Sequence, residues 1–434
     1  MKSVLPERKT LHPLDIEHRE LPAAAARAVR ELADEISTTL ARLPGPARHT
    51  TTLTDPALLE LIDARAGELP DAVRHAVRPP EGDAGAAVLR RLPLTDAELG
   101  PTPANWRAAA PRGAAATRAV WQGLDQAGRP PVGEGGAGVL RRQPLTHGYL
   151  GPTRANGRAG ARCAAADPHS ASLRLDLAVL LLARCAGEPF GWVGQQDGRL
   201  VNNIVPSPGH EFEQSGASSA TLLSPHTEDA FHPERANLLM LACLRNVDAV
   251  GTTVSSIRRV DLDPADRALL TTPTLPILPD VSYGDGHERH TAVPLPTIWD
   301  AAENTGAASF PTLRYDPAYT PLDDADPAFR LAYARLGAEL ERVCVTVALA
   351  PGEMLLVDND VAVHGRVPFT ARYDGTDRWL KRVNIRLPER RRRAAEADEN
   401  GYGQRTVAPF RKRIGRAGAE RETTPDERGR REHS

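Results

Sequence analysis

Apolar residues recur at helical spacing in four parts of the chain. The first part is residues 16–43, and a second helix is predicted to begin at Pro56 with Asp55 as its N-cap. Two further helices are predicted at 171–186 and 327–342, where leucine and alanine return every three or four positions. This spacing gathers the apolar side chains of each helix on one face, which must then pack against another layer.

Short apolar runs of the kind that form strands fill much of the remaining chain. Residues 86–94 form one such run, and from Trp192 to Val260 several runs are separated by Gly, Pro, Asn and Ser. Two more strands are predicted at 343–349 and 353–358. Many short strands with helices mainly on the N-terminal side predict a mainly β fold with flanking helices (α+β), arranged as a jelly roll with an N-terminal helical buttress.

An internal repeat interrupts this pattern. Residues 88–107 and 139–158 share 14 of 20 positions at an offset of 51 residues. Two copies indicate a local duplication, because solenoid folds need three or more repeats to bury a shared core. We therefore expect a single domain over 1–388 that contains a poorly ordered, partly duplicated insertion at 108–168, followed by a disordered polar tail at 389–434.

Composition narrows the class of protein. The formal net charge of −2 argues against a general nucleic-acid binder, which normally carries a clear basic excess. The longest apolar run, around Leu177 to Ala183, is too short to span a bilayer, and the N-terminus lacks the apolar core of a signal peptide. The four cysteines are scattered without a C-x-x-C pair, which is typical of a reducing compartment. We therefore expect a cytoplasmic protein that has no membrane partner.

Two histidines and a glutamate form a candidate metal site. His226 and Glu228 are one residue apart, so on a strand their side chains point to the same face, and His364 follows the predicted strand 353–358. Two imidazoles and one carboxylate can bind one face of an octahedral Fe(II) ion and leave the other positions open. The alternative interpretation of H-x-E is a strand-end histidine bonded to a nearby acid. His232 competes for the ligand role, although a structural role suits it better.

Two arginines follow the distal histidine. Arg378 lies fourteen positions after His364, and Arg382 lies four positions further on, on the same face if the segment is a strand. Two guanidiniums on one face could bind two carboxylates through bidentate hydrogen bonds. The alternative is a solvated basic strand that pairs with Asp374 and Asp377.

These motifs resemble those of a known family. S-P-H-T-E-D-A-F-H-P-E-R-A-N at 224–237 and D-N-D-V-A-V-H-G-R-V-P-F-T-A-R-Y-D-G-T-D-R-W-L-K-R at 358–382 look like the clavaminate synthase-like Fe(II)/2-oxoglutarate-dependent oxygenases. The similarity is greatest to the free arginine and asparagine β-hydroxylases of antibiotic biosynthesis, and it covers about 80–107 and 170–388. It implies a double-stranded β-helix (jelly roll) core.

The resemblance also implies roles for the metal site and for the co-substrate. His226, Glu228 and His364 match the iron ligands of the family. Arg378 matches the arginine that binds the distal carboxylate of 2-oxoglutarate. Thr252 resembles the threonine that supports this carboxylate, with the adjacent Thr253 as the alternative.

Three further positions match residues that bind the amino acid. Arg382 matches the arginine for the substrate α-carboxylate, and Gln195 resembles a glutamine near the amino group, with Gln196 as the neighbouring alternative. Asp316 matches the first of two aspartates that hold a guanidinium in the arginine hydroxylases. Ala318 occupies the second of these positions, and this departure puts arginine itself in doubt.

The implied activity is hydroxylation of an unactivated carbon, usually Cβ, of a free basic or polar amino acid such as arginine or a derivative. The implied cofactors are Fe(II), 2-oxoglutarate and O2, and a substrate tethered to a carrier protein is also compatible. The same fold supports desaturation or oxidative cyclisation. A metal-dependent isomerase or hydrolase is a rival that Arg378 disfavours, and a catalytically impaired duplicate is another.

Overall fold

The fold was analysed in a computed structural model of the chain. The structure describes residues 16–40, 53–93, 171–283, 289–300, 311–390, 396 and 399–410.

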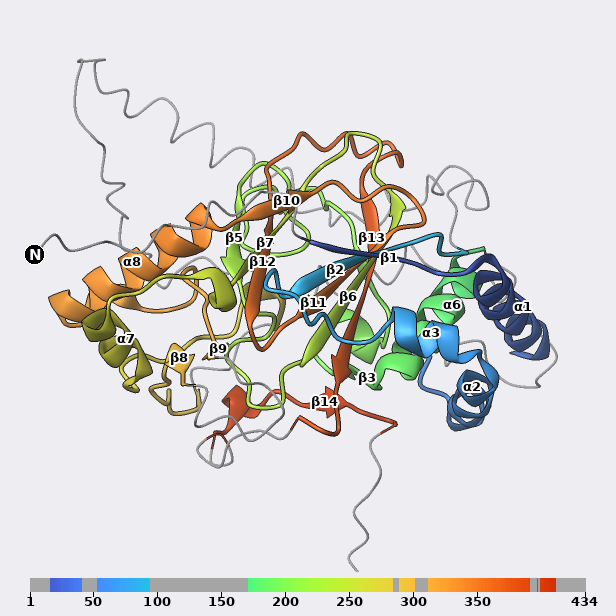
Figure 1. Cartoon of the computed structure of the whole chain (residues 1–434), viewed down its shortest axis with the longest axis horizontal. Helices are drawn as coiled ribbons and strands as arrows, with labels where there is room; N and C mark the ends of the chain where they lie inside the picture. The colour runs from blue at the N-terminus through green and yellow to red at the C-terminus, as the bar shows by residue number, and fades with distance from the viewer. Residues whose placement is uncertain are drawn as a thin grey trace, which may run out of the picture.

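A large sheet forms the centre of the molecule (Figure 1). Its strands lie in the order β1-β2-β11-β6-β13-β3-β14, and β4 pairs with β13. All the pairs are antiparallel except β1 with β2. The strands are β1 Glu17–Glu20, β2 Ala86–Arg90, β3 Glu188–Trp192, β4 Asn202–Ile204, β6 Leu238–Arg245, β11 Met354–Asp358, β13 Trp379–Arg386 and β14 Thr406–Val407.

A smaller antiparallel sheet packs against the large one. Its order is β10-β7-β12-β5, and its strands are β5 Leu223–His226, β7 Thr252–Ser256, β10 Val345–Val347 and β12 Ala362–Arg366. An apolar core fills the space between the sheets, with Leu241 and Leu355 from the large sheet and Val254 and Ala362 from the small one. Burial of such side chains between two sheets is the main force that holds the sheets together.

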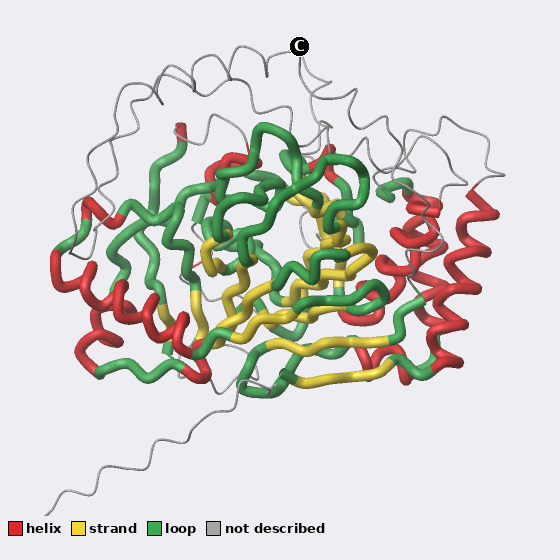
Figure 2. Tube along the Cα trace, turned by 90° about the horizontal axis from the view of Figure 1, so that it is seen from above, coloured by secondary structure: helices red, strands yellow, loops and turns green. Residues whose placement is uncertain are grey.

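Helices flank the strands on both sides (Figure 2). Four helices lie beside the large sheet and share one apolar core with it: α1 Ala23–Leu40, α2 Pro56–Glu68, α3 Asp71–Ala76 and α6 Ala171–Ala186. As predicted, Asp55 caps α2, because its carboxylate accepts from the N–H groups of Ala57 and Leu58 at 3.0 and 3.2 Å. The mainly β fold with flanking helices is confirmed.

A second group of helices covers the opposite end of the molecule. It contains α7 Pro264–Thr271 and α8 Pro327–Arg342, which pack near the hairpin of β8 Ile298–Trp299 and β9 Thr312–Leu313. Helices from the N-terminal part of the chain thus pack on the large sheet, as predicted, and α7 and α8 add a second group beside the small sheet. Single 3-10 turns lie at Gln196–Gly198, Ile257–Arg259, Val281–Tyr283, Leu322–Asp324 and Gly401–Gly403.

The prediction of one helix over 16–43 is wrong at its start. Residues 17–20 form β1, because their backbone pairs in parallel with β2. The N–H of Leu21 then bonds to the carbonyl of Arg90 at 3.0 Å, and the helix begins only after Pro22. Pairing with a distant strand is a tertiary effect that helical periodicity does not reveal.

The prediction of a disordered tail over 389–434 is wrong for residues 396 and 399–410. Glu396 is 1% exposed, and its carboxylate pairs with Arg235 at 2.8 Å and Arg314 at 3.3 Å. Gly401 has a φ of +54°, and a Cβ there would lie 2.2 Å from the ring of His232, so only glycine allows this close approach. The insertion at 108–168 and the second repeat copy lie outside the described residues, and they remain predictions.

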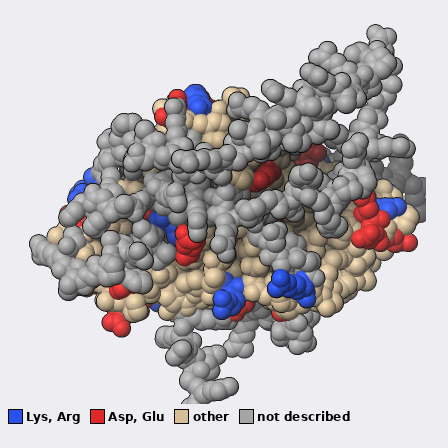
Figure 3. Space-filling view, turned by 180° about the vertical axis from the view of Figure 1, so that it is seen from behind, with Lys and Arg blue, Asp and Glu red and all other residues tan. Residues whose placement is uncertain are grey.

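The described surface carries mixed charge. On the face in Figure 3, basic and acidic residues are interspersed among uncharged ones, and no continuous basic patch is visible among the described residues there. No helix in the described part of the chain combines the length and the apolar composition that crossing a bilayer requires.

The buried carboxylate of Glu396 leads to a stability prediction. Glu396→Ala leaves the guanidiniums of Arg235 and Arg314 buried without this partner, so the free energy of unfolding should fall by about 3–5 kcal/mol. Urea denaturation followed by circular dichroism measures this change. Glu389→Ala, at an exposed position of the same C-terminal region, is the matched control and should leave the midpoint unchanged. Equal midpoints for both variants would contradict a structural role for residue 396.

Candidate active site

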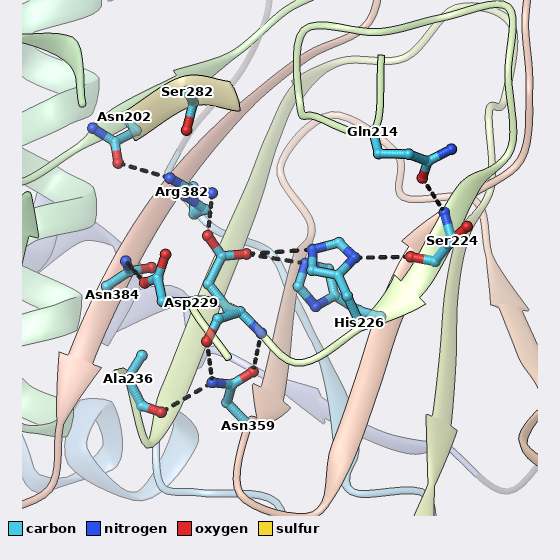
Figure 4. Close-up of polar contacts among 12 residues, drawn as sticks. Asn202, Gln214, Ser224, His226, Asp229, Ala236, Ser282, Asn359, Arg382 and Asn384 are labelled. Atoms are coloured by element: carbon cyan, nitrogen blue, oxygen red, sulfur yellow. Dashed lines mark hydrogen bonds and ion pairs between the residues drawn. The ribbon is translucent and has the colours of Figure 1, made fainter. Parts of the chain in front are cut away.

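Three side chains that the sequence singles out converge between β5 and β12. His226 is the last residue of β5, Glu228 follows two residues later, and His364 lies in the middle of β12, directly opposite His226 in the register. Glu228 Oε2 lies 3.4 Å from His364 Nε2 and 3.8 Å from His226 Nε2. One possible ligand atom from each residue lies within 4.8 Å of the other two, so the structure brings the predicted triad together (Figure 4).

This set of donor atoms fits a divalent iron ion. His226 Nδ1 lies 2.8 Å from the carbonyl oxygen of Ser224, and when Nδ1 donates this hydrogen bond, the lone pair of Nε2 is free to bind a metal. Two imidazole nitrogens and one carboxylate oxygen form a facial set that leaves further positions of an octahedral ion open. Among the described residues, no other group of three or more potential ligands is placed in this way.

Asn359 fixes the backbone of the acidic ligand. Its Oδ1 accepts from the N–H of Glu228 at 2.9 Å, and its Nδ2 donates to the carbonyls of Glu228 and Ala236 at 3.1 and 3.0 Å (Figure 4). Asn359 lies five residues before His364, so one segment supplies the distal histidine and also holds the glutamate. Asn359 was not predicted, because a side-chain bond to a distant backbone leaves no pattern in the sequence.

The charges around the triad favour binding of a cation. Burial opposes the negative charge of Glu228, but Arg382, which contacts Glu228 Oε1, and the two histidines hold the pKa of Glu228 well below its ordinary value. Burial also opposes a charge on His226, yet its hydrogen bond with Glu228 and the nearby Asp316 raise the pKa of His226 to about 9. A metal ion and a proton compete for the same imidazole nitrogen, so metal binding here releases protons.

Arg378 is a buried cation that directly precedes β13. Its Nη2 donates a hydrogen bond of 2.8 Å to Thr252 Oγ1 in β7, so the two residues assigned to 2-oxoglutarate by resemblance lie together. Burial and the neighbouring Arg366 lower the pKa of Arg378 to about 10. In the described part of the chain its Nε has no hydrogen-bond partner. Asp377 accepts from backbone N–H groups of the preceding turn at 2.8 and 2.6 Å and not from Arg378, so the arginine favours an anionic ligand.

Contacts also separate the alternatives for other positions. The side-chain amide of Gln196 bonds to the backbone N–H and C=O of Asn203, both at 2.9 Å, and is thereby committed away from Arg382. Thr253 is adjacent to Thr252 in β7, so its side chain points to the opposite face of the strand.

His232 Nδ1 accepts from the N–H of Glu234 at 2.9 Å, its Nε2 lies 3.1 Å from a backbone carbonyl, and burial lowers its pKa to about 4. His232 is therefore structural.

Gln195, which the resemblance assigns to the substrate amino group, lies beside Arg382. Gln195 Oε1 accepts from Arg382 Nη2 at 2.7 Å, and Gln195 Nε2 donates to Ser282 Oγ at 2.9 Å. Asn202 Oδ1 accepts from the same guanidinium at 3.3 Å (Figure 4). Asn202, which the sequence analysis missed, thus helps Gln195 to orient Arg382.

A pocket beside the triad is lined by three carboxylates besides Glu228, namely Asp229, Asp280 and Asp316. It is lined by His226, Glu228, Arg382, Asp280 and Asp316, among others. Burial raises the pKa of Asp316 to about 6 and also raises the pKa of Asp280, and each of the two is affected by nearby acidic groups. A cationic group between these carboxylates would relieve their repulsion. Asp280 was not predicted, because it lies in a proline-rich stretch without a periodic pattern.

Known proteins match this chain over the same region. The "Taurine catabolism dioxygenase TauD, TfdA family" matches residues 193–384. The enduracididine beta-hydroxylase of Streptomyces hygroscopicus is 40% identical over 52% of this chain and 71% of its own length. The L-ornithine/L-arginine 3-hydroxylase of Catenulispora acidiphila is 37% identical over 50% of this chain and 68% of its own length.

Solved structures agree with the sequence matches. The non-heme iron oxygenase OrfP, in complex with Fe and alpha-ketoglutaric acid, superimposes with a TM-score of 0.58 at 31% identity, over 85% of this chain and 94% of OrfP. The region of similarity contains the triad, both arginines and the pocket carboxylates. The predicted family resemblance is confirmed, and the chain belongs to the TauD/TfdA family of dioxygenases.

Proposed function

We propose that this chain is an Fe(II)/2-oxoglutarate-dependent oxygenase that hydroxylates Cβ of a free amino acid with a cationic side chain, in the biosynthesis of a secondary metabolite. In this proposal the two packed sheets are the double-stranded β-helix core of the family, and the domain extends over 1–388 together with the folded part of the C-terminal segment. The observation that carries the proposal is that Arg382, Asp280 and Asp316 line the same pocket as His226 and Glu228 of the triad.

The charged residues have complementary tasks. His226, Glu228 and His364 would hold Fe(II), and Arg378 with Thr252 would bind the distal carboxylate of 2-oxoglutarate. When bound, iron and 2-oxoglutarate supply the oxidation: O2 gives one atom to the substrate C–H bond and one to succinate, and CO2 is released. Arg378 suits this role because it is a buried guanidinium with an N–H group to spare.

The amino acid is anchored at both ends. Arg382, oriented by Gln195, would bind its α-carboxylate, and Asp280 with Asp316 would bind its cationic side chain. Arg382 contacts Glu228, and Asp316 acts electrostatically on His226. The carbons between the two anchors are thereby held next to the triad, which is the geometry that oxidation at Cβ needs.

The pocket supports a basic substrate despite the departure at Ala318. The second aspartate of the arginine-hydroxylase pattern is missing there, but Asp280 brings a second carboxylate into the same pocket. The matched relatives are named for enduracididine, ornithine and arginine. Arginine and its cyclic derivatives are therefore the first substrates to test.

Turnover of free amino acids tests the proposed function. We expect succinate to form with Fe(II), 2-oxoglutarate and L-arginine, L-ornithine or enduracididine, and the amino acid to gain one oxygen atom by mass spectrometry. A loss of two hydrogens would show desaturation or ring closure at the same site. A chain that binds iron but turns over none of these amino acids would contradict the proposal, and a carrier-bound substrate or a catalytically impaired duplicate would then replace it.

Loss of either pocket carboxylate should weaken binding of the amino acid and leave binding of 2-oxoglutarate unchanged. Asp316→Asn and Asp280→Asn should each raise the KM for the basic amino acid by about 30-fold or more, since loss of one charge of a desolvated pair costs about 2 kcal/mol or more. The KM for 2-oxoglutarate should stay unchanged. Asp323→Asn, at an exposed position, is the control. An equal rise in both KM values would assign the aspartates to the fold and not to the substrate.

Loss of Arg378 should weaken binding of the co-substrate 2-oxoglutarate. Arg378→Ala should weaken 2-oxoglutarate binding by about 100-fold, on the order of 3 kcal/mol, because it removes a charge-assisted bidentate contact. Isothermal titration calorimetry without O2 measures this affinity directly. Arg330→Ala, on the exposed side of α8, should bind 2-oxoglutarate like the unaltered protein. Undiminished affinity in Arg378→Ala would place the co-substrate elsewhere.

A further inference from the structure

The carboxylate of Asp229, the residue after the ligand Glu228, joins three separate elements. Asp229 Oδ2 accepts from Trp192 Nε1 in β3 at 2.7 Å and from Asn384 Nδ2 in β13 at 3.0 Å (Figure 4). Asp229 Oδ1 accepts from the hydroxyl of Tyr283. The residue is 8% exposed. Both of its oxygens are therefore satisfied by buried donors from different parts of the chain.

The backbone connects this carboxylate rigidly to the metal ligand. Asp229 has a φ of +54°, in the left-handed region that aspartate tolerates better than most residues. On its other side Glu228 is held by Asn359 through both its N–H and its carbonyl, at 2.9 and 3.1 Å. The Glu228–Asp229 peptide is thus fixed at both ends, and a shift of the Asp229 side chain moves the ligand.

Tyr283 carries the connection to the substrate side of the pocket. Its ring is buried edge-on against Trp192 and Phe231, with centroids 5.7 and 4.7 Å apart. It ends the 280–283 segment, which also contains Asp280 in the pocket wall and Ser282.

Polar contacts and the backbone together connect Glu228 to the 280–283 segment by two routes. Ser282 Oγ accepts from Gln195 at 2.9 Å, Gln195 accepts from Arg382 at 2.7 Å, and Arg382 contacts Glu228. One branch from Glu228 therefore runs through Arg382, Gln195 and Ser282. The other runs through Asp229 and Tyr283, and both end on the 280–283 segment.

We infer that Asp229 is a positioning residue that, through Tyr283, couples the 280–283 segment of the substrate pocket to the metal ligand Glu228. This inference rests on the proposed function for the identity of the substrate, but not for the effect on the metal. Coupling between two sites is reciprocal. An amino acid that orders the 280–283 segment therefore also orders Glu228 and tightens metal binding. Metal binding in turn tightens binding of the amino acid.

Asp229→Gly tests the connection to the metal. Glycine adopts the positive φ without strain and removes the whole side chain with its carboxylate. With Mn(II) as an ion that binds without turnover, its affinity for the full chain should fall by about tenfold in calorimetry, as for other residues that support metal ligands. Thermal unfolding of the metal-free variant is recorded alongside. Unchanged Mn(II) affinity in a folded Asp229→Gly chain would overturn the positioning role.

Tyr283→Phe tests the coupling itself. It keeps the ring and removes the hydroxyl that reaches Asp229. L-Arginine should tighten Mn(II) binding to the unaltered chain, and this factor should shrink by about fivefold or more in Tyr283→Phe. Tyr402→Phe, in the same cluster of aromatic residues but on the C-terminal segment, is the matched control and should keep the full factor.

The outcomes separate the two claims. If Tyr283→Phe keeps the full effect of L-arginine, the coupling is wrong while the proposed function stands. If the unaltered chain neither responds to L-arginine nor oxidises it, the proposed substrate is wrong, and the Mn(II) affinity of Asp229→Gly still decides the role of Asp229.

Discussion

The site depends on the antiparallel pairing of β5 with β12. This pairing sets His226 opposite His364, although the two residues are far apart in the sequence. A slip of one residue would turn one imidazole to the other face of the sheet, because side chains alternate along a strand. Asn359 adds the third fixed point, since the segment that carries His364 also grips the backbone of Glu228. Strand pairing and the side-chain amide of Asn359 therefore set the geometry of the triad, before any ion contributes.

Around the triad, the charged side chains complement the charges of the ligands that we propose. Glu228 is balanced by Arg382 and the histidines. Among the described residues Arg378 donates to the hydroxyl of Thr252, and Asp280 and Asp316 line one pocket. A buried cation or a pair of buried carboxylates is costly in the protein alone. In the proposed function, binding of a dicarboxylate at Arg378 and of a basic amino acid at the pocket aspartates would remove both costs. The affinity for the two ligands would then depend on the folded architecture.

The sequence predicted the parts of the site that have a short-range pattern. The H-x-E spacing and the four-residue interval between Arg378 and Arg382 are patterns of this kind. The strand argument behind them holds only in part, because Glu228 lies in the turn after β5. His364, expected after a strand, lies within β12. Helices at 56–68, 171–186 and 327–342 followed from apolar periodicity and from the Asp55 cap. These features depend on neighbouring residues, so the sequence contains them directly.

Other features depend on contacts between distant segments. Asn359, Asp280 and Asn202 act through single side chains that meet partners over a hundred residues away or in irregular loops, so no periodicity marks them. Residues 17–20 became a strand because β2 was available to pair with them. The charged composition of the C-terminal segment resembled that of a disordered tail, yet two of its glutamates neutralise arginines of the core.

This last arrangement has a consequence for the order in which the protein matures. Arg235 and Arg314 are synthesised well before Glu396 and Glu399. A nascent chain that has formed its sheets apart from β14 therefore still carries two buried guanidiniums without these partners. Arg314 also bonds through its Nε to the carbonyl of Ala230, in the stretch that follows Glu228 and Asp229. A protease cut or a premature stop between 390 and 396 would therefore arrest maturation next to the metal ligands, although it removes none of the family's motifs.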